Sequence, residues 1–99
     1  MDANVTYQQT IYYHQDPGHG WFEVSFKQLQ ALGLAPNDFT KYSYISQSRG
    51  SVFLEEDCDA QRYHERHVER LGMPPHIINE YYPGDSFIRN LPGIREVAA

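Results

Sequence analysis

The sequence predicts an α+β fold in two layers, in which two helices cover one face of a mostly antiparallel sheet and the element order is ββαββαβ. Three observations lead to this prediction. Short segments rich in β-branched and aromatic residues are separated by turn sequences that contain glycine or proline. Two other segments repeat apolar residues at helical spacing and end at a glycine. The length of 99 residues, with 40% hydrophobic and 14% aromatic residues, suits one small domain with a modest core.

The first half of the chain predicts a β-hairpin followed by a short helix. Residues 5–14 (VTYQQTIYYH) are β-branched and aromatic, and the loop QDPGHG returns the chain into a second strand at residues 21–24. Ser25 is suited to be the N-cap of a helix of about two turns. Residues 26–32 carry its apolar stripe, and Gly33 stands where a helix commonly ends.

The second half predicts another hairpin, a longer helix and a last strand. Residues 42–46 and 52–56 have strand composition and are joined by the turn QSRGS. The helix that follows ends at Gly72, and the sequence MPP prevents its continuation. Residues 76–82 (HIINEYY) then indicate a strand. The apolar face of this helix is formed by Ala60, Tyr63, His67 and Leu71.

Residues 1–99 are expected to form one domain, with the core at 3–83 and an irregular C-terminal arm at 84–99. Eight Lys and Arg against 13 Asp and Glu give a net charge of −5, which argues against binding to a phosphate backbone. Arg62, Arg66 and Arg70 lie along one side of the longer helix and keep direct nucleic-acid binding as an alternative. With one cysteine and no long apolar run, the chain is expected in a reducing cytoplasm and away from membranes.

Four acids crowd the corner between the fourth strand and the longer helix: Glu55, Glu56, Asp57 and Asp59. Several carboxylates could hold a hard cation, but the spacing does not match a calcium loop. The favoured interpretation is that Asp57 or Asp59 caps the helix and that the acids complement its dipole. A solvated acidic rim for a basic partner is compatible with that interpretation.

No catalytic, metal or cofactor motif accompanies the histidines and the single cysteine. His64 and His67 are three residues apart, but a zinc site would need further ligands such as Cys58, and neither CxxC nor HExxH is present. We expect ordinary histidines and a partly buried Cys58 near a helix N-terminus, where its pKa could be lowered. DPGHGW lacks the GxxxxGK[ST] and GxGxxG patterns of phosphate loops. Instead, exposed His19 and Trp21 on the hairpin would suit a recognition surface.

Five segments of the chain resemble a pattern found in small uncharacterised proteins carried by bacteriophages and other mobile elements. They are DPGHGW, the helix ending LGL, YSY, FLEEDCD and DSFIR, and together they span residues 16–89. FLEEDCD is the most specific of them. The longer helix, QRYHERHVERLG, is more charged than the pattern, and the tail is longer. The resemblance implies a phage or mobile-element setting, in the cytoplasm of a bacterial host, and no mechanism.

These observations favour a non-enzymatic accessory protein that binds a host or phage protein, such as a nucleic-acid-handling defence complex. An inhibitor of a bacterial defence system, including an anti-CRISPR protein, is the most specific form of this hypothesis. The alternative is a small-molecule- or metal-binding protein that uses the acidic corner and histidines. No cofactor is expected, and an exposed terminal strand could pair two copies into a homodimer. The predicted partner-binding residues are His19, Trp21, Glu55, Glu56, Asp57, Asp59 and Arg89.

Overall fold

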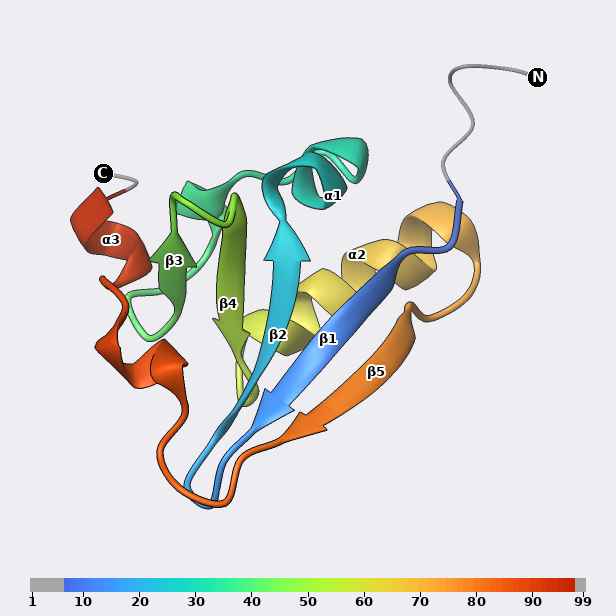
Figure 1. Cartoon of the computed structure of the whole chain (residues 1–99). Coiled ribbons are helices and arrows are strands. Elements are labelled where there is room, and N and C mark those ends of the chain that lie inside the picture. Colours follow the sequence, from blue (N-terminus) through green and yellow to red (C-terminus); the bar gives the residue numbers. More distant parts are fainter. Residues whose placement is uncertain (1–6, 98–99) are drawn as a thin grey trace.

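The computed structural model describes residues 7–97, which form a five-stranded mixed sheet with helices at its face and edge (Figure 1). The strands lie in the order β3-β4-β2-β1-β5. All neighbouring strands are antiparallel except β1 and β5, which are parallel. The strands are β1 (Thr10–Gln15), β2 (Gly20–Ser25), β3 (Tyr44–Ser46), β4 (Ser51–Glu55) and β5 (His76–Tyr81).

Three α-helices and two 3-10 helices complete the described chain. They are α1 (Phe26–Ala31), η1 (Pro36–Asp38), α2 (Asp59–Leu71), η2 (Phe87–Asn90) and α3 (Ile94–Val97). The α+β class is confirmed, but the order differs from the predicted ββαββαβ because η1 lies between α1 and β3. The tail differs from the predicted irregular arm, because it contains η2 and α3 and buries Ile88 and Ile94 completely. The predicted core boundary at residue 3 and the first residues of the predicted strand 5–14 lie outside the described residues.

The apolar core lies on the face of the sheet that α1 and α2 cover. Figure 1 shows α2 running behind the sheet, with α1 beyond the end of β2. Residues alternate between the two faces along each strand, so every second side chain points towards these helices. On this face Val24, Val52 and Leu54 pack with Leu29 of α1 and Tyr63 of α2, all of them fully buried.

The opposite face carries a second, smaller apolar cluster beneath the C-terminal arm, here residues 82–97. Trp21 and Phe53 point to this side and pack against Ile88 of η2, with Tyr44 and Leu91 at the margin. The arm also covers the edge of the sheet at β3, where the Ile94 N–H donates to the carbonyl of Ser43 at 2.8 Å. A two-layer description is therefore incomplete, because part of the second face is covered as well.

The helix ends follow the local sequence at Ser25 and Gly72 and depart from it at the start of α2. Ser25 closes a capping box, since its hydroxyl accepts from the Gln28 N–H and its own N–H donates to the Gln28 side chain, each at 3.0 Å. Gly72 ends α2 at φ 74, a left-handed conformation that favours glycine. The predicted cap by Asp57 or Asp59 is wrong, because Cys58 occupies the N-cap position and, within the described residues, no side-chain hydrogen bond caps the helix.

Candidate functional site

A hollow of ≈ 470 Å³ opens on the second face of the sheet, where β2 begins and β4 ends. We call it the acidic hollow. It combines aromatic rings with carboxylates, and it contains five of the seven residues predicted to bind a partner. It is lined by His19, Trp21, Tyr42, Tyr44, Glu55, Asp57, Cys58 and Arg89.

An ion pair between Asp16 and Arg89 builds one wall of the hollow. The Arg89 guanidinium donates to both carboxylate oxygens of Asp16, at 2.7 and 2.8 Å, and so ties the β1–β2 loop to η2. The same carboxylate accepts from the backbone N–H groups of Gly18, His19 and Ser86. These hydrogen bonds, led by those from Arg89, hold the pKa of Asp16 well below its usual range. A side chain at position 18 would collide with Arg89, because a Cβ there would lie 2.6 Å from Nη2.

Trp21 forms the floor of the hollow. The Arg89 guanidinium carbon lies 5.4 Å from the centroid of the Trp21 ring, within the range of a cation–π contact. The Tyr44 ring meets it edge-on at 6.3 Å, and the His19 ring lies 6.0 Å away. The prediction that Trp21 is exposed is wrong: only 2% of its surface is accessible, because the arm and neighbouring rings cover it. His19, by contrast, is exposed.

The carboxylates on the opposite wall give the hollow its negative character. Asp57 is exposed, Glu55 is half-buried, and the Asp57 N–H donates to Glu55 Oε1 at 3.0 Å. Burial raises the pKa of Glu55, and the nearby Asp57 charge adds to the effect. Since the charge of Arg89 is balanced by Asp16, the hollow keeps an excess of negative charge.

The other two acids of the predicted site lie outside the hollow. Glu56 turns to the helix-covered side of the sheet, where its carboxylate accepts from the Tyr13 hydroxyl at 2.8 Å. Asp59 is buried and accepts from the Thr40 N–H and from the hydroxyls of Thr40 and Ser43. Asp59 therefore holds the segment before β3 in place and is not accessible to a partner.

Tyr42 and Tyr44 belong to the hollow and were not among the predicted site residues. Tyr42 is exposed, whereas Tyr44 is half-buried against Trp21. The motif YSY contained a signal, since alternate residues in an extended segment point the same way. What the motif could not reveal was that β4 and the β1–β2 loop would lie beside these rings.

The histidines and Cys58 do not form a metal centre within residues 7–97, where no three candidate ligand side chains gather. His67 is buried and satisfied by the backbone: its Nε2 accepts from the Gln9 N–H at 3.0 Å, and its Nδ1 lies 2.7 Å from the carbonyl of Met73. The expected partial burial of Cys58 is wrong, because its side chain lies exposed at the start of α2.

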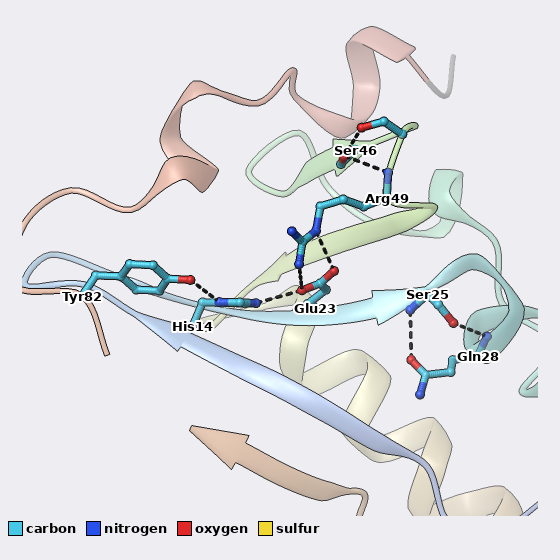
Figure 2. Close-up of polar contacts among 8 residues, drawn as sticks. His14, Glu23, Ser25, Gln28, Ser46, Arg49 and Tyr82 are labelled. Carbon is cyan, nitrogen blue, oxygen red and sulfur yellow. Dashed lines mark hydrogen bonds and ion pairs between the residues drawn. The ribbon is translucent and has the colours of Figure 1, made fainter. Parts of the chain in front are cut away.

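A separate polar network lies on the same face of the sheet, nearer to β1 (Figure 2). His14 stands between the Tyr82 hydroxyl, 2.8 Å from Nδ1, and Glu23, 2.9 Å from Nε2. An ionised carboxylate only accepts, so Nε2 donates to Glu23, while Nδ1 forms a hydrogen bond with the Tyr82 hydroxyl. Arg49 donates twice to Glu23, at 3.0 and 3.1 Å.

Glu23 is the charged centre of this network. Burial would raise its pKa, but hydrogen bonds from His14, Arg49 and Ser51 outweigh it and lower the pKa to about 2. The Phe87 ring packs edge-on against His14 at 5.8 Å and closes the network from outside. Glu23 and Tyr82 lie far apart in the chain and belong to no sequence motif, so neither was predicted as a site residue.

No protein-family model, curated protein or solved structure matches this chain. The likeness to phage and mobile-element proteins therefore stays a prediction. No helix among residues 7–97 has both the length and the apolar character that crossing a bilayer requires. The geometry of the acidic hollow consequently carries the functional interpretation.

Proposed function

We propose that this chain is a non-enzymatic phage or mobile-element protein that binds a host or phage protein through the acidic hollow. The observation that carries the proposal is that two carboxylates without an ion pair among residues 7–97, Glu55 and Asp57, lie beside aromatic rings in one concave site. The charged group of a partner's Lys or Arg could form ion pairs with Glu55 and Asp57. Its aliphatic chain could then pack against Tyr42 or Tyr44. Arg89 does not compete for these acids, because it is held by Asp16.

The most specific form of the proposal is an inhibitor of a bacterial defence system, including an anti-CRISPR protein. Proteins that bind nucleic acid contact its phosphates with Lys and Arg side chains. An acidic site can bind these same side chains and so prevent that contact. The net charge of −5 supports such a partner, and the motifs DPGHGW and FLEEDCD supply the phage setting by resemblance.

The experiment begins with a tagged full chain expressed in a bacterium, washed with nuclease and analysed for proteins that copurify in stoichiometric amount. Binding to the identified protein is then measured for Asp57→Lys, with the exposed Glu69→Lys on α2 as the matched control. We expect Asp57→Lys to weaken binding about tenfold or more and to flatten its salt dependence, since one ion pair is replaced by a repulsion. Equal affinities for the two variants would contradict the proposal.

The pKa of Glu55 gives a second test of the same site. A cation bound beside Glu55 favours its ionised form, so binding should tighten as the pH rises through the pKa of this residue. Glu55→Gln should remove that part of the pH dependence. Binding that is independent of pH in the unaltered protein between about pH 4 and 7 would count against Glu55 as a contact.

A small cationic molecule is the second candidate ligand, because ≈ 470 Å³ lies within the usual size range of small-molecule sites. A screen of nucleotides, amines and divalent metals by thermal unfolding would test it, together with elemental analysis. A ligand that raises Tm in the unaltered chain and not in Asp57→Lys would favour this candidate.

A further inference from the structure

The two edges of the sheet are treated differently by the chain (Figure 1). At the β3 edge the C-terminal arm supplies backbone partners: Ile45 N–H donates to the carbonyl of Pro92 at 3.0 Å, and Tyr44 forms a bridge with Gly93. At the β5 edge no backbone group of residues 7–97 pairs with the outer side of the strand. Such an open edge is a template for another strand.

The register with β1 identifies which backbone groups of β5 are free. The His76 N–H donates to the carbonyl of Gln9 and the Tyr82 N–H to that of Gln15, each at 2.8 Å, in a regular parallel ladder. In such a ladder alternate residues turn their backbone groups to the neighbouring strand. Ile77, Asn79 and Tyr81 therefore direct their N–H and C=O groups outward.

The Glu80 carboxylate is the only charged acid within β5, and the other usual protections of an edge are missing from this strand. Natural edge strands are commonly blunted by lysine, proline, a bulge or a covering loop. β5 (HIINEY) contains neither lysine nor proline, and its pairing with β1 is continuous over all six residues. The prolines at positions 75 and 83 stand just outside the strand, so they limit its length without blocking its edge.

We propose that β5 pairs antiparallel with β5 of a second copy of this chain, about a twofold axis at Ile78. The outward Ile77 then exchanges hydrogen bonds with the partner's Asn79, and Asn79 with the partner's Ile77. An axis between two residues is excluded, because it would set outward backbone groups against inward ones. The proposal goes beyond the proposed function, and it uses none of the residues that line the acidic hollow.

The pairing of polar side chains selects this register among those that the backbone allows. His76, Ile78 and Glu80 share one face of β5, because they alternate along the strand. With the axis at Ile78, His76 lies opposite the partner's Glu80, and the same pair recurs on the other side of the axis. An axis at Asn79 would instead place Glu80 opposite the partner's Ile78.

A groove beside the seam would be completed by the second copy. This groove, of ≈ 490 Å³, lies between α2 and the β1–β5 edge; Phe22, Ala60 and Ile77 are among its apolar lining residues, and Asn79 lines it as well. In the proposed register the partner's Asn79 lies directly against Ile77. The second copy thus adds a residue to the groove of the first.

The test measures the mass of the full chain by light scattering across a concentration series, with Asn79→Pro as the main variant. Proline at this edge position removes an outward donor and leaves the ladder with β1 intact. We expect the unaltered chain to form dimers and Asn79→Pro to raise the dimer dissociation constant about tenfold or more, as two hydrogen bonds per dimer are lost. A monomer at all concentrations, or an Asn79→Pro dimer of unchanged strength, overturns the proposal.

If Asn79→Pro does not fold, exchanging the residues at positions 76 and 80 provides a second test of the proposal. Glu80→His places two histidines opposite each other and should weaken the dimer. Adding His76→Glu to the same chain restores a pair of Glu and His across the seam and should restore the dimer. Circular dichroism establishes that each variant is folded. Failure of the double variant to recover the dimer overturns the register. Partner capture by the acidic hollow is scored separately, with the Asp57→Lys variant.

Discussion

Different interactions stabilise the packing on the two faces of the sheet. The face under α1 and α2 is closed by apolar side chains such as Val24, Leu29 and Leu54, whose packing needs no particular partner atom. The face under the C-terminal arm has a small apolar cluster and two charged contacts, Asp16–Arg89 and Glu23–Arg49. The apolar packing on the helix side should therefore be insensitive to pH, whereas the ion pairs on the other face should depend on it.

The largest effect is expected on the apolar face. Leu54→Ala removes a fully buried side chain from the main cluster, so we expect the free energy of unfolding to fall by about 2–5 kcal/mol. Urea unfolding at constant m value measures it. Val68→Ala on the exposed side of α2 is the control, with an expected change within about 0.5 kcal/mol. Similar losses for the two variants would show that the cluster is not the stabilising core.

A smaller and pH-dependent effect is expected at Glu23. Glu23→Gln keeps the shape of the side chain but sets an amide against the Arg49 guanidinium, so at pH 7 unfolding should become easier by about 1–3 kcal/mol. The lowered pKa of Glu23 stabilises the fold above the unfolded value of 4.5, and this contribution is lost as the pH falls through about 2. The difference between variant and unaltered chain should therefore narrow over that range.

Chemical denaturation between about pH 7 and 2 measures the Glu23 effect, with Glu69→Gln on the exposed side of α2 as the control. The control should follow the unaltered chain at every pH. A gap between Glu23→Gln and the unaltered chain that stays constant down to pH 2 would show that Glu23 is not ionised in the fold.

The smallest effect on the arm side is expected at Ser86. Its hydroxyl is buried and has no hydrogen-bond partner within residues 7–97. Ser86→Ala should therefore leave the free energy of unfolding within about 0.5 kcal/mol, or raise it. Ser43→Ala makes the contrast, because that hydroxyl donates to Asp59 and accepts from the Glu55 N–H, and its loss should cost about 1–3 kcal/mol. Equal costs measured by thermal unfolding would contradict this difference.

Local sequence predicted the elements because their signals are local. The capping box at Ser25 and the left-handed glycine at position 72 depend on residues within a few positions, so the start of α1 and the end of α2 could be placed. The apolar stripe of Ala60, Tyr63 and His67 is likewise a matter of helical spacing, and all three are buried. The tail places Phe87, Leu91 and Ile94 at helical spacing, but Pro92 and Gly93 interrupt the pattern, so the short η2 and α3 were missed.

The candidate site could be predicted only in part, because its geometry depends on distant contacts. His19, Glu55 and Asp57 were identified from local charge and turn chemistry. The burial of Trp21 could not be foreseen, since it depends on η2 packing onto the sheet. Asp59 was predicted to be accessible to a partner, because it is one of four neighbouring acids. It is buried instead, and Thr40 and Ser43 donate hydrogen bonds to its carboxylate.

The parallel pairing of β1 with β5 has a consequence for how the protein is made. Thr10 and His76 lie side by side in that ladder but are 66 residues apart in the chain. The ion pair of Asp16 with Arg89 likewise joins residues that are 73 positions apart. During synthesis from the N-terminus, β1 lacks its neighbour on one side until residues 76–81 have emerged. Such long-range closure of a sheet favours slow folding.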